Sequence, residues 1–353
     1  MTEAPPARGW TRGGRLRLAL GVGALAGLVG LVVMADPREV LREVARVGWA
    51  GFGLFLLPSL AIYGLDALGW RLCFERPPPV SLLRLLLVRQ AGEAINNTLP
   101  VVQVGGEPVK ALLLKHHGLP LAEGLASVLV AKVEVALAQL VFVLCGVVAA
   151  LLAGAAGAGR LTVGAAVVVA LGLVATSLGV VALRRGPGRL LTAAAARTGL
   201  LRGLVARRAE ALARLDASLA RVYARGPARG ALSFAVFLAA WLLETLEVWI
   251  FARALDLPLG PLAALAIASL LTVARAVGSF SPGSLGVAEG GGVLLFVAFG
   301  QTEALALAFA VVRRARDLPW ILLGLGTLGA YGLLRPRAPA AVGARGPARA
   351  DPG

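Results

Sequence analysis

Two short segments of this chain place a carboxylate at the same distance from a proline. One runs from Pro100 to Glu107 and the other from Pro282 to Glu289, so both read Pro, six residues, Glu. Each contains glycines and lies among hydrophobic residues. Because Pro and Gly free backbone groups that are costly to leave unsatisfied in lipid, such breaks persist only inside protein or beside water. Paired breaks of this kind are typical of transporters with internal repeats, whose polar binding site lies where the breaks meet.

Further charged side chains fall within hydrophobic segments, where a charge costs at least about 2.5 kcal/mol at the bilayer centre. We therefore expect them to line a protein interior, with structural ion pairing as the alternative role for each. Spacing allows Glu107 to face Lys110 and Arg89 to face Glu93, because residues three and four apart share a helix face. The supporting intramembrane charges are Arg89, Glu93, Glu134, Glu244, Glu247 and Arg275.

The lysines are confined to one part of the sequence. The chain has only Lys110, Lys115 and Lys132, and it uses arginine for positive charge everywhere else. Compact ammonium groups near the first break indicate phosphate binding, to which a helix N-terminus at Glu107 would contribute. The neighbouring pair 116–117 is His-His, but no further His or Cys stands at ligand spacing, so no metal site is predicted.

Composition fixes the class of protein. With 58% hydrophobic residues and a mean hydropathy of +0.82, the chain is expected to be an integral membrane protein. The net charge of +16 comes from arginines outside the apolar segments, without interleaved aromatics, which favours anionic lipid at a cytoplasmic face over nucleic acid. Cys73 and Cys145 have no disulfide or zinc spacing. No nucleotide motif or GxSxG setting is present, so no cofactor is predicted and a classical enzyme is disfavoured.

The predicted fold is all-α and polytopic, with about seven to eight transmembrane helices, two re-entrant or broken helix segments, and an inverted repeat. Eleven arginines against Glu210 and Asp216 place the linker 184–230 in the cytoplasm as an amphipathic segment. Arg313, Arg314 and Arg316 interrupt the second half, and we expect a separate last span at about 318–334. The predicted divisions are a cytoplasmic tail 1–14, a first membrane half 15–183 with a broken segment 80–122, the linker 184–230, a second membrane half 231–335 with a broken segment 281–312, and a disordered tail 336–353.

Three stretches resemble the signature segments of the lysylphosphatidylglycerol synthase transmembrane-region family. They are Asn-Asn-Thr-Leu-Pro at 96–100, Gly-Gly-Glu-Pro-Val-Lys-Ala at 105–111 and Ser-Pro-Gly-Ser-Leu-Gly-Val-Ala-Glu at 281–289. The family includes the flippase part of the bacterial multiple peptide resistance factor, stand-alone flippase-like proteins and a branch associated with hopanoid lipids. The order of the motifs is specific for the family but not for the lipid.

The resemblance implies a bacterial inner-membrane protein that moves or presents a polar lipid. After Arg335 only a short tail remains, so we expect the soluble domain that transfers lysine in the synthases to be absent and lysyl transfer by this chain alone not to occur. The lipid head-group cavity, taken from the matching motif positions and from the lysines expected to engage phosphate, comprises Asn97, Pro100, Gly105, Gly106, Glu107, Lys110, Lys132, Pro282, Gly286 and Glu289.

The sequence thus predicts a multi-pass flippase-like protein with both termini in the cytoplasm, handling a phospholipid, aminoacyl-phospholipid, hopanoid or glycolipid. Two alternatives stay open: a membrane subunit assisting a separate lipid-modifying enzyme of hopanoid or glycolipid synthesis, and a membrane-embedded lipid-modifying transferase. Membrane lipids are the expected partners. Gly-rich helices such as 21–30 also leave a homo-oligomer open.

Overall fold

A computed structural model describes residues 36–98, 105–154, 158–199, 202–224, 226–278 and 286–332. This described part is helical and contains no strand. The predicted first span before residue 36, both tails, Pro100 and Pro282 lie outside the described residues.

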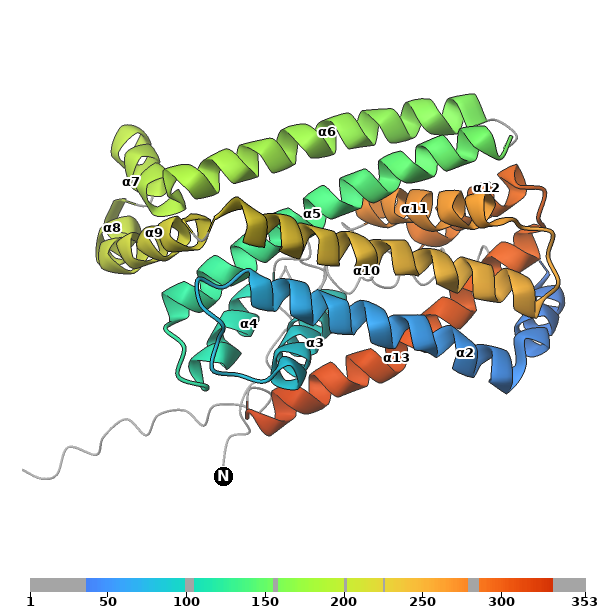
Figure 1. Cartoon of the computed structure of the whole chain (residues 1–353), viewed down its shortest axis with the longest axis horizontal. Helices are drawn as coiled ribbons and strands as arrows, with labels where there is room; N and C mark the ends of the chain where they lie inside the picture. Colours follow the sequence, from blue (N-terminus) through green and yellow to red (C-terminus); the bar gives the residue numbers. More distant parts are fainter. Residues whose placement is uncertain are drawn as a thin grey trace, which may run out of the picture.

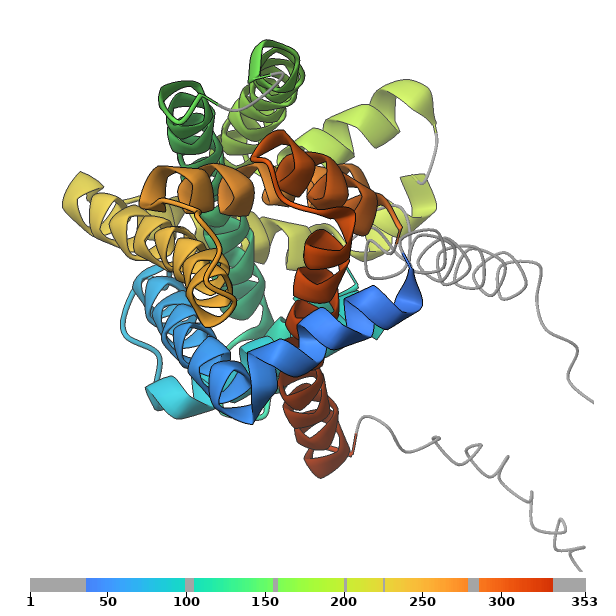
Figure 2. The same ribbon diagram turned by 90° about the vertical axis from the view of Figure 1, so that its right-hand side faces the viewer.

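The first half contains α2 (Pro37–Leu72), α3 (Leu82–Thr98), α4 (Gly106–Lys115), α5 (Leu121–Leu152) and α6 (Ala158–Arg185). Asp36 caps α2, its Oδ1 accepting a hydrogen bond from the backbone N–H of Arg38 at 2.9 Å. Gly48 has a φ of 63°, a conformation open to glycine, and it bends α2 so that its first turns run at an angle to the rest (Figure 2).

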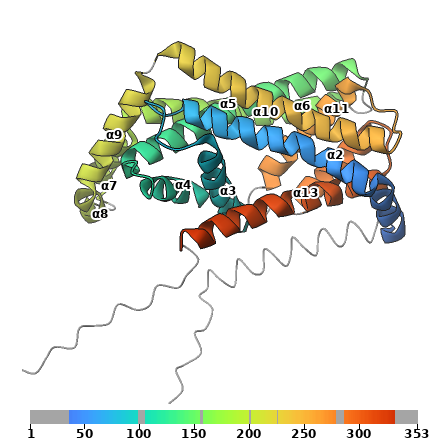
Figure 3. The ribbon, with the colours of Figure 1, turned by 60° about the horizontal axis from the view of Figure 1, so that its bottom comes forward.

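The linker forms α7 (Pro187–Thr198), α8 (Arg202–Arg207) and α9 (Ala209–Tyr223). These helices lie across one end of the helix bundle, where α6 ends and the next long helix begins (Figure 3). Asp216 of α9 holds the start of α7, since its carboxylate accepts hydrogen bonds from the backbone N–H groups of Gly188 and Arg189 at 2.8 and 2.9 Å. Leu219 and Val222 are the buried apolar side chains of α9.

The second half contains α10 (Pro227–Ala254), α11 (Pro261–Val277), α12 (Val287–Ala298) and α13 (Glu303–Ala330). Helix α13 is continuous, so the separate last span predicted at 318–334 is wrong. The arginines that suggested an interruption are in the middle of one helix, where acidic side chains of α10 and α12 pair with them.

Four stretches among the described residues are long and apolar enough to cross a membrane: α2, α5, α10 and Ala166–Arg185 of α6. Helices α3 and α11 have 17 residues each. Helices of that length extend about 26 Å, which is less than the roughly 30 Å of a bilayer core. Helices α4 and α12 are shorter still. The pair α3 and α4 lies within the predicted broken segment 80–122, whereas in the second half only α12 lies within the predicted segment 281–312 and α11 precedes it.

The two halves pack in the same way. Helices α2, α3, α4 and α5 of the first half correspond in order to α10, α11, α12 and α13 of the second. Across the halves, α3 contacts α13 and, equivalently, α11 contacts α5; likewise α2 contacts α13 and α10 contacts α5. Within each half, α4 packs on α5 and α12 packs on α13. The equivalent helices α2 and α10 run in opposite directions along the long axis, and so do α5 and α13 (Figure 1). Equivalent helices of the two halves therefore make equivalent contacts but run in opposite directions. This relationship is an inverted repeat.

Candidate functional site: a charged cavity between the halves

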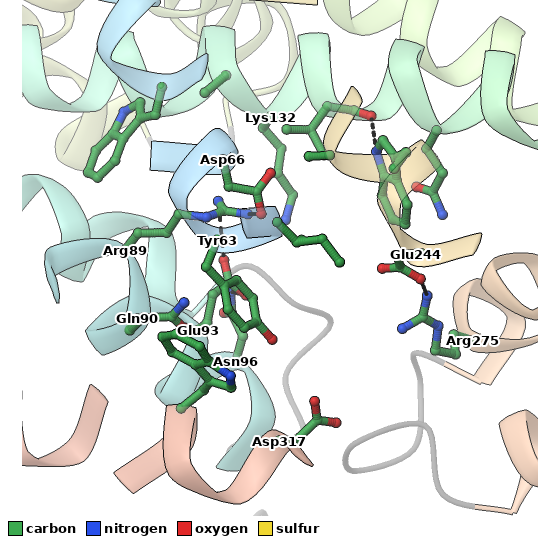
Figure 4. Close-up of a pocket in the computed structure, with 18 of the residues that line it drawn as sticks. Tyr63, Asp66, Arg89, Gln90, Glu93, Asn96, Lys132, Glu244, Arg275 and Asp317 are labelled. Carbon is green, nitrogen blue, oxygen red and sulfur yellow. Dashed lines mark hydrogen bonds and ion pairs between the residues drawn. The ribbon is translucent and has the colours of Figure 1, made fainter. Parts of the chain in front are cut away.

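A cavity of about 380 Å³ lies between the two halves. It is lined by side chains of α2, α3, α4 and α5 from the first half and of α10, α11 and α13 from the second (Figure 4). Its charged lining residues are Asp66, Arg89, Glu93, Glu107, Lys110, Lys132, Glu244, Arg275, Arg314, Arg316 and Asp317.

The contact between α3 and α4 depends on two glycines. A Cβ atom on Gly106 would lie 2.1 Å from the carbonyl oxygen of Gly92, so the two backbones approach too closely for any other residue. Asn96 satisfies the first N–H of α4, its Oδ1 accepting a hydrogen bond from Gly106 N at 2.7 Å. This approach fixes the first turn of α4, and with it Glu107, against the cavity.

Glu107 belongs to a network of ion pairs that joins α3, α4 and α5. Its carboxylate is 3.0 Å from Lys110 Nζ and 3.1 Å from Lys132 Nζ. Lys110 Nζ also lies 2.7 Å from a carboxylate oxygen of Glu93. Lys110 is buried between two carboxylates, whereas Lys132 reaches the same site from α5.

The network extends to α2 through Arg89. A guanidinium nitrogen of Arg89 lies 2.5 Å from the Asp66 carboxylate and another lies 3.9 Å from Glu93, as the four-residue spacing predicted for the second pair. Figure 4 shows Asp66 and Arg89 facing each other across the cavity edge. Sequence reasoning missed Asp66, although a carboxylate within the apolar segment of α2 was a usable signal.

Glu289 occupies the first turn of α12 as Glu107 occupies the first turn of α4. One of its carboxylate oxygens accepts a hydrogen bond from the backbone N–H of Gly286 at 2.7 Å, which caps the helix. The other is 2.9 Å from Nη2 of Arg314 on α13. Glu289 itself is buried, and it contacts the cavity lining through Arg314.

The two glutamates have equivalent partners. Glu107 pairs with Lys132 and Glu289 pairs with Arg314, and in both cases the cation is 25 residues further along the chain. Each cation lies on the long helix that follows the broken segment, α5 or α13. The two glutamates therefore have the same kind of cationic partner, at the same separation along the chain, in both halves.

A second group of charges joins α10, α11 and α13. Glu244 lies 2.8 Å from Arg275 and 2.7 Å from Arg313. Glu247, one turn further on and fully buried, lies 2.9 Å from Arg316 and 3.9 Å from Arg313. Sequence reasoning assigned the two glutamates and Arg275 to the intramembrane charges but treated Arg313 and Arg316 as an interruption, although their spacing of three along one helix indicated a shared face.

The remaining predicted residues fall in different places. Gly105 precedes α4 and Gly286 precedes α12 as the N-cap residues. Asn97 is in the last turn of α3, with its side chain outside the described part. Glu134 is not in the cavity lining; its carboxylate accepts hydrogen bonds from the Ser233 hydroxyl and, at 3.4 Å, from the Cys73 thiol.

The adjacent histidines lie outside the cavity, in the turn between α4 and α5. His117 Nε2 is 2.5 Å from the hydroxyl oxygen of Tyr331 at the end of α13, and the ring of His116 also packs near Tyr331. Burial is the main cause that lowers the pKa of His117 below its usual value. These residues join the two halves at the end of the bundle that carries α7–α9.

The arrangement is suited to binding charges rather than to a covalent reaction. Cationic and carboxylate groups converge on one polar space at the middle of a helical membrane protein, where an isolated charge is unstable. A bound group with charges of its own can exchange partners with these pairs. Two cations from equivalent positions, Lys132 and Arg314, line that space together.

Comparison with known proteins identifies the family of this chain. The family model of the lysylphosphatidylglycerol synthase TM region matches residues 16–326 of the chain. No curated protein and no solved structure matches it. The family match spans both broken segments and every helix that lines the cavity, so this chain belongs to the lysylphosphatidylglycerol synthase transmembrane-region family.

Proposed function

We propose that this protein translocates a polar lipid across the membrane, with the head group in the cavity and the acyl chains in the surrounding bilayer. The observation that carries the proposal is the repeated pair, Glu107 with Lys132 and Glu289 with Arg314, at one cavity between inverted halves. Membership of a family named for a lipid synthase supports a lipid as the ligand. Inverted repeats with interrupted helices at a central site are typical of alternating-access transport.

The head-group phosphate is proposed to bind between Lys132 and Arg314. Their side chains are 50% and 37% exposed, whereas those of Glu107 and Glu289 are 11% and 2% exposed. The cations are thus presented to the cavity and the carboxylates lie behind them, where they hold the cations in place. Lys110, which the sequence suggested as a phosphate ligand, is only 5% exposed and lies between two carboxylates, so we assign it a structural part.

The basic end of the molecule is proposed to face the cytoplasm of a bacterial cell. Helices α7–α9 carry arginines at exposed positions, including Arg189, Arg197, Arg207 and Arg208. Positive loops are retained on the cytoplasmic side, where the inner leaflet presents anionic lipid. The inner membrane, cytoplasmic termini and an anionic-lipid contact at α7–α9 follow as parts of the proposal.

Lipid reorientation in proteoliposomes tests the proposed function. The phospholipids carry a fluorescent label on an acyl chain, and dithionite added outside quenches the label only on lipids in the outer leaflet. Faster loss of the fluorescence that the inner leaflet protects therefore reports translocation. We expect wild type to accelerate this loss and Glu107→Gln and Glu289→Gln each to reduce it at least tenfold. Glu210→Gln is the matched control, because it makes the same change at an exposed position on α9. Equal rates for wild type, both cavity variants and protein-free vesicles would overturn the proposal.

A further inference from the structure

We infer that the transported head group is zwitterionic, with an anionic phosphate, a cationic amine and no net charge. This inference rests on the proposed function and specifies its substrate class. It follows from the total charge of the cavity and from the positions of the charges that remain accessible within it.

The cavity and its immediate ion-pair partners contain as many acidic as basic side chains. The acidic set is Asp66, Glu93, Glu107, Glu244, Glu247, Glu289 and Asp317, and the basic set is Arg89, Lys110, Lys132, Arg275, Arg313, Arg314 and Arg316. The breaks at 99–104 and 279–285 contain no charged residue, so their sequence does not alter this balance. The site is electrically neutral when all these groups are ionised.

Both signs of charge face the cavity. Besides the accessible cations Lys132 and Arg314, the side chains of Glu93 and Asp317 are 31% and 30% exposed. Figure 4 shows Lys132 entering from the helix at the top of the view, whereas Asp317 lies at the bottom. With a phosphate at Lys132 and Arg314, the carboxylates of Glu93 and Asp317, which line the same cavity, are the groups that would pair with the amine of the head group.

Gln90 adds a neutral donor to the same wall. Gln90 lines the cavity and is only 2% exposed. Its side-chain Nε2 has no hydrogen-bond partner among the described residues. Buried donors are normally satisfied, so this amide points to a ligand oxygen. The phosphate or ester oxygens of a phospholipid head group provide such an acceptor.

A neutral cavity favours a neutral cargo for two physical reasons. A head group with net charge would leave one uncompensated charge in a region of low dielectric. A membrane potential of 100 mV changes the equilibrium ratio of a singly charged lipid between the two leaflets about 50-fold. The ratio for a zwitterionic lipid does not depend on the potential. Transport of the zwitterion is therefore electroneutral.

The test compares three acyl-chain-labelled lipids in the same proteoliposome assay: phosphatidylethanolamine with no net charge, anionic phosphatidylglycerol and cationic lysylphosphatidylglycerol. We expect the full-length protein to move phosphatidylethanolamine at least tenfold faster than either charged lipid. A valinomycin-imposed potassium potential of about 100 mV is expected to leave its rate unchanged. Equal or faster movement of a charged lipid would overturn the inference while supporting the proposed function, and no movement of any lipid would overturn both.

A variant provides a second, independent readout. Replacing both accessible acids, Glu93→Gln with Asp317→Asn, makes the cavity net positive, so we expect the rate ratio of phosphatidylglycerol to phosphatidylethanolamine to rise at least tenfold. Glu210→Gln is the control and is expected to keep the wild-type ratio. An unchanged ratio in the folded double variant would contradict the inference; if that variant does not fold, the wild-type lipid comparison decides.

Discussion

Glu107 and Glu289 occupy equivalent positions in the two halves of the molecule. Each carboxylate lies in the first turn of the helix that follows a break, and each pairs with a cation 25 residues further on, at 3.1 Å for Lys132 and 2.9 Å for Arg314. Because the halves are inverted, the two pairs approach one cavity from helices of opposite direction. The relationship connects the repeated sequence motif to the proposed site.

The buried ion pairs of α10 and α13 should be important for stability. Glu247 is fully buried between Arg313 and Arg316. Removing one partner of a buried pair typically costs about 3–5 kcal/mol, because it leaves an uncompensated charge. We predict a loss of this size in the free energy of unfolding for Glu247→Gln, measured by SDS titration in mixed micelles.

The matched control for this change is Glu210→Gln. Glu210 pairs with Arg214, but their side chains are 80% and 70% exposed, and exposed pairs contribute only about 0–1 kcal/mol. Equal unfolding free energies for the two variants would show that the Glu247 pairs do not stabilise the fold.

The close approach of α3 and α4 predicts a sharp difference between adjacent glycines. In Gly106→Ala the new methyl group would meet the carbonyl oxygen of Gly92 at 2.1 Å, which the backbone must shift to relieve. In Gly105→Ala the nearest atom is a methyl of Ile95 at 3.7 Å, an ordinary contact. We predict that Gly106→Ala lowers the free energy of unfolding by about 1–3 kcal/mol or more, whereas Gly105→Ala changes it much less. Similar melting temperatures in detergent would count against the observed packing.

The corresponding contact between α11 and α12 allows a compensating change. A Cβ atom on Gly291 would lie 2.4 Å from the Cβ of Ala274, whereas one on Gly290 would meet nothing within 4 Å. We predict a lower melting temperature for Gly291→Ala than for Gly290→Ala. Combining Gly291→Ala with Ala274→Gly should recover part of the loss, because the two methyl groups no longer collide. Failure of the second change to restore any stability would contradict this contact.

Cysteine labelling tests the orientation of the bundle. Cys145 is exposed and Cys73 is buried, so a Cys145→Ser background removes the accessible native thiol of the described part. We predict that an impermeant maleimide reaches Glu303→Cys in intact cells and Ala206→Cys only after permeabilisation, because α8 belongs to the basic end. The reverse pattern would show that α7–α9 face outside.

The sequence was most informative where polar residues interrupt apolar segments. Pro100, Glu107, Pro282 and Glu289 marked both breaks, and the family resemblance is confirmed over 16–326. Helix spacing also predicted the pairs of Glu107 with Lys110 and Arg89 with Glu93. These features are local, so neighbouring residues along a helix suffice to recognise them.

Long-range partners could not be predicted in the same way. Arg313, Arg314 and Arg316 were read as an interruption of the membrane segment, because their acidic partners come from α10 and α12 and only the packed fold brings them together. One signal was available: Glu107 and Glu289 are separated by the same number of positions as Lys132 and Arg314. Extending the repeat by that offset would have identified Arg314 as the counterpart of Lys132.

Replacing both accessible cations together tests most directly whether lipid head groups bind in the cavity. Lys132→Gln with Arg314→Gln removes both positive charges of the proposed phosphate site and leaves shorter, uncharged polar side chains. We predict that this double variant, at a melting temperature comparable to that of wild type, translocates labelled phosphatidylethanolamine at least tenfold more slowly in proteoliposomes. Translocation at the wild-type rate by the folded double variant would contradict the claim that lipid head groups pass through this cavity.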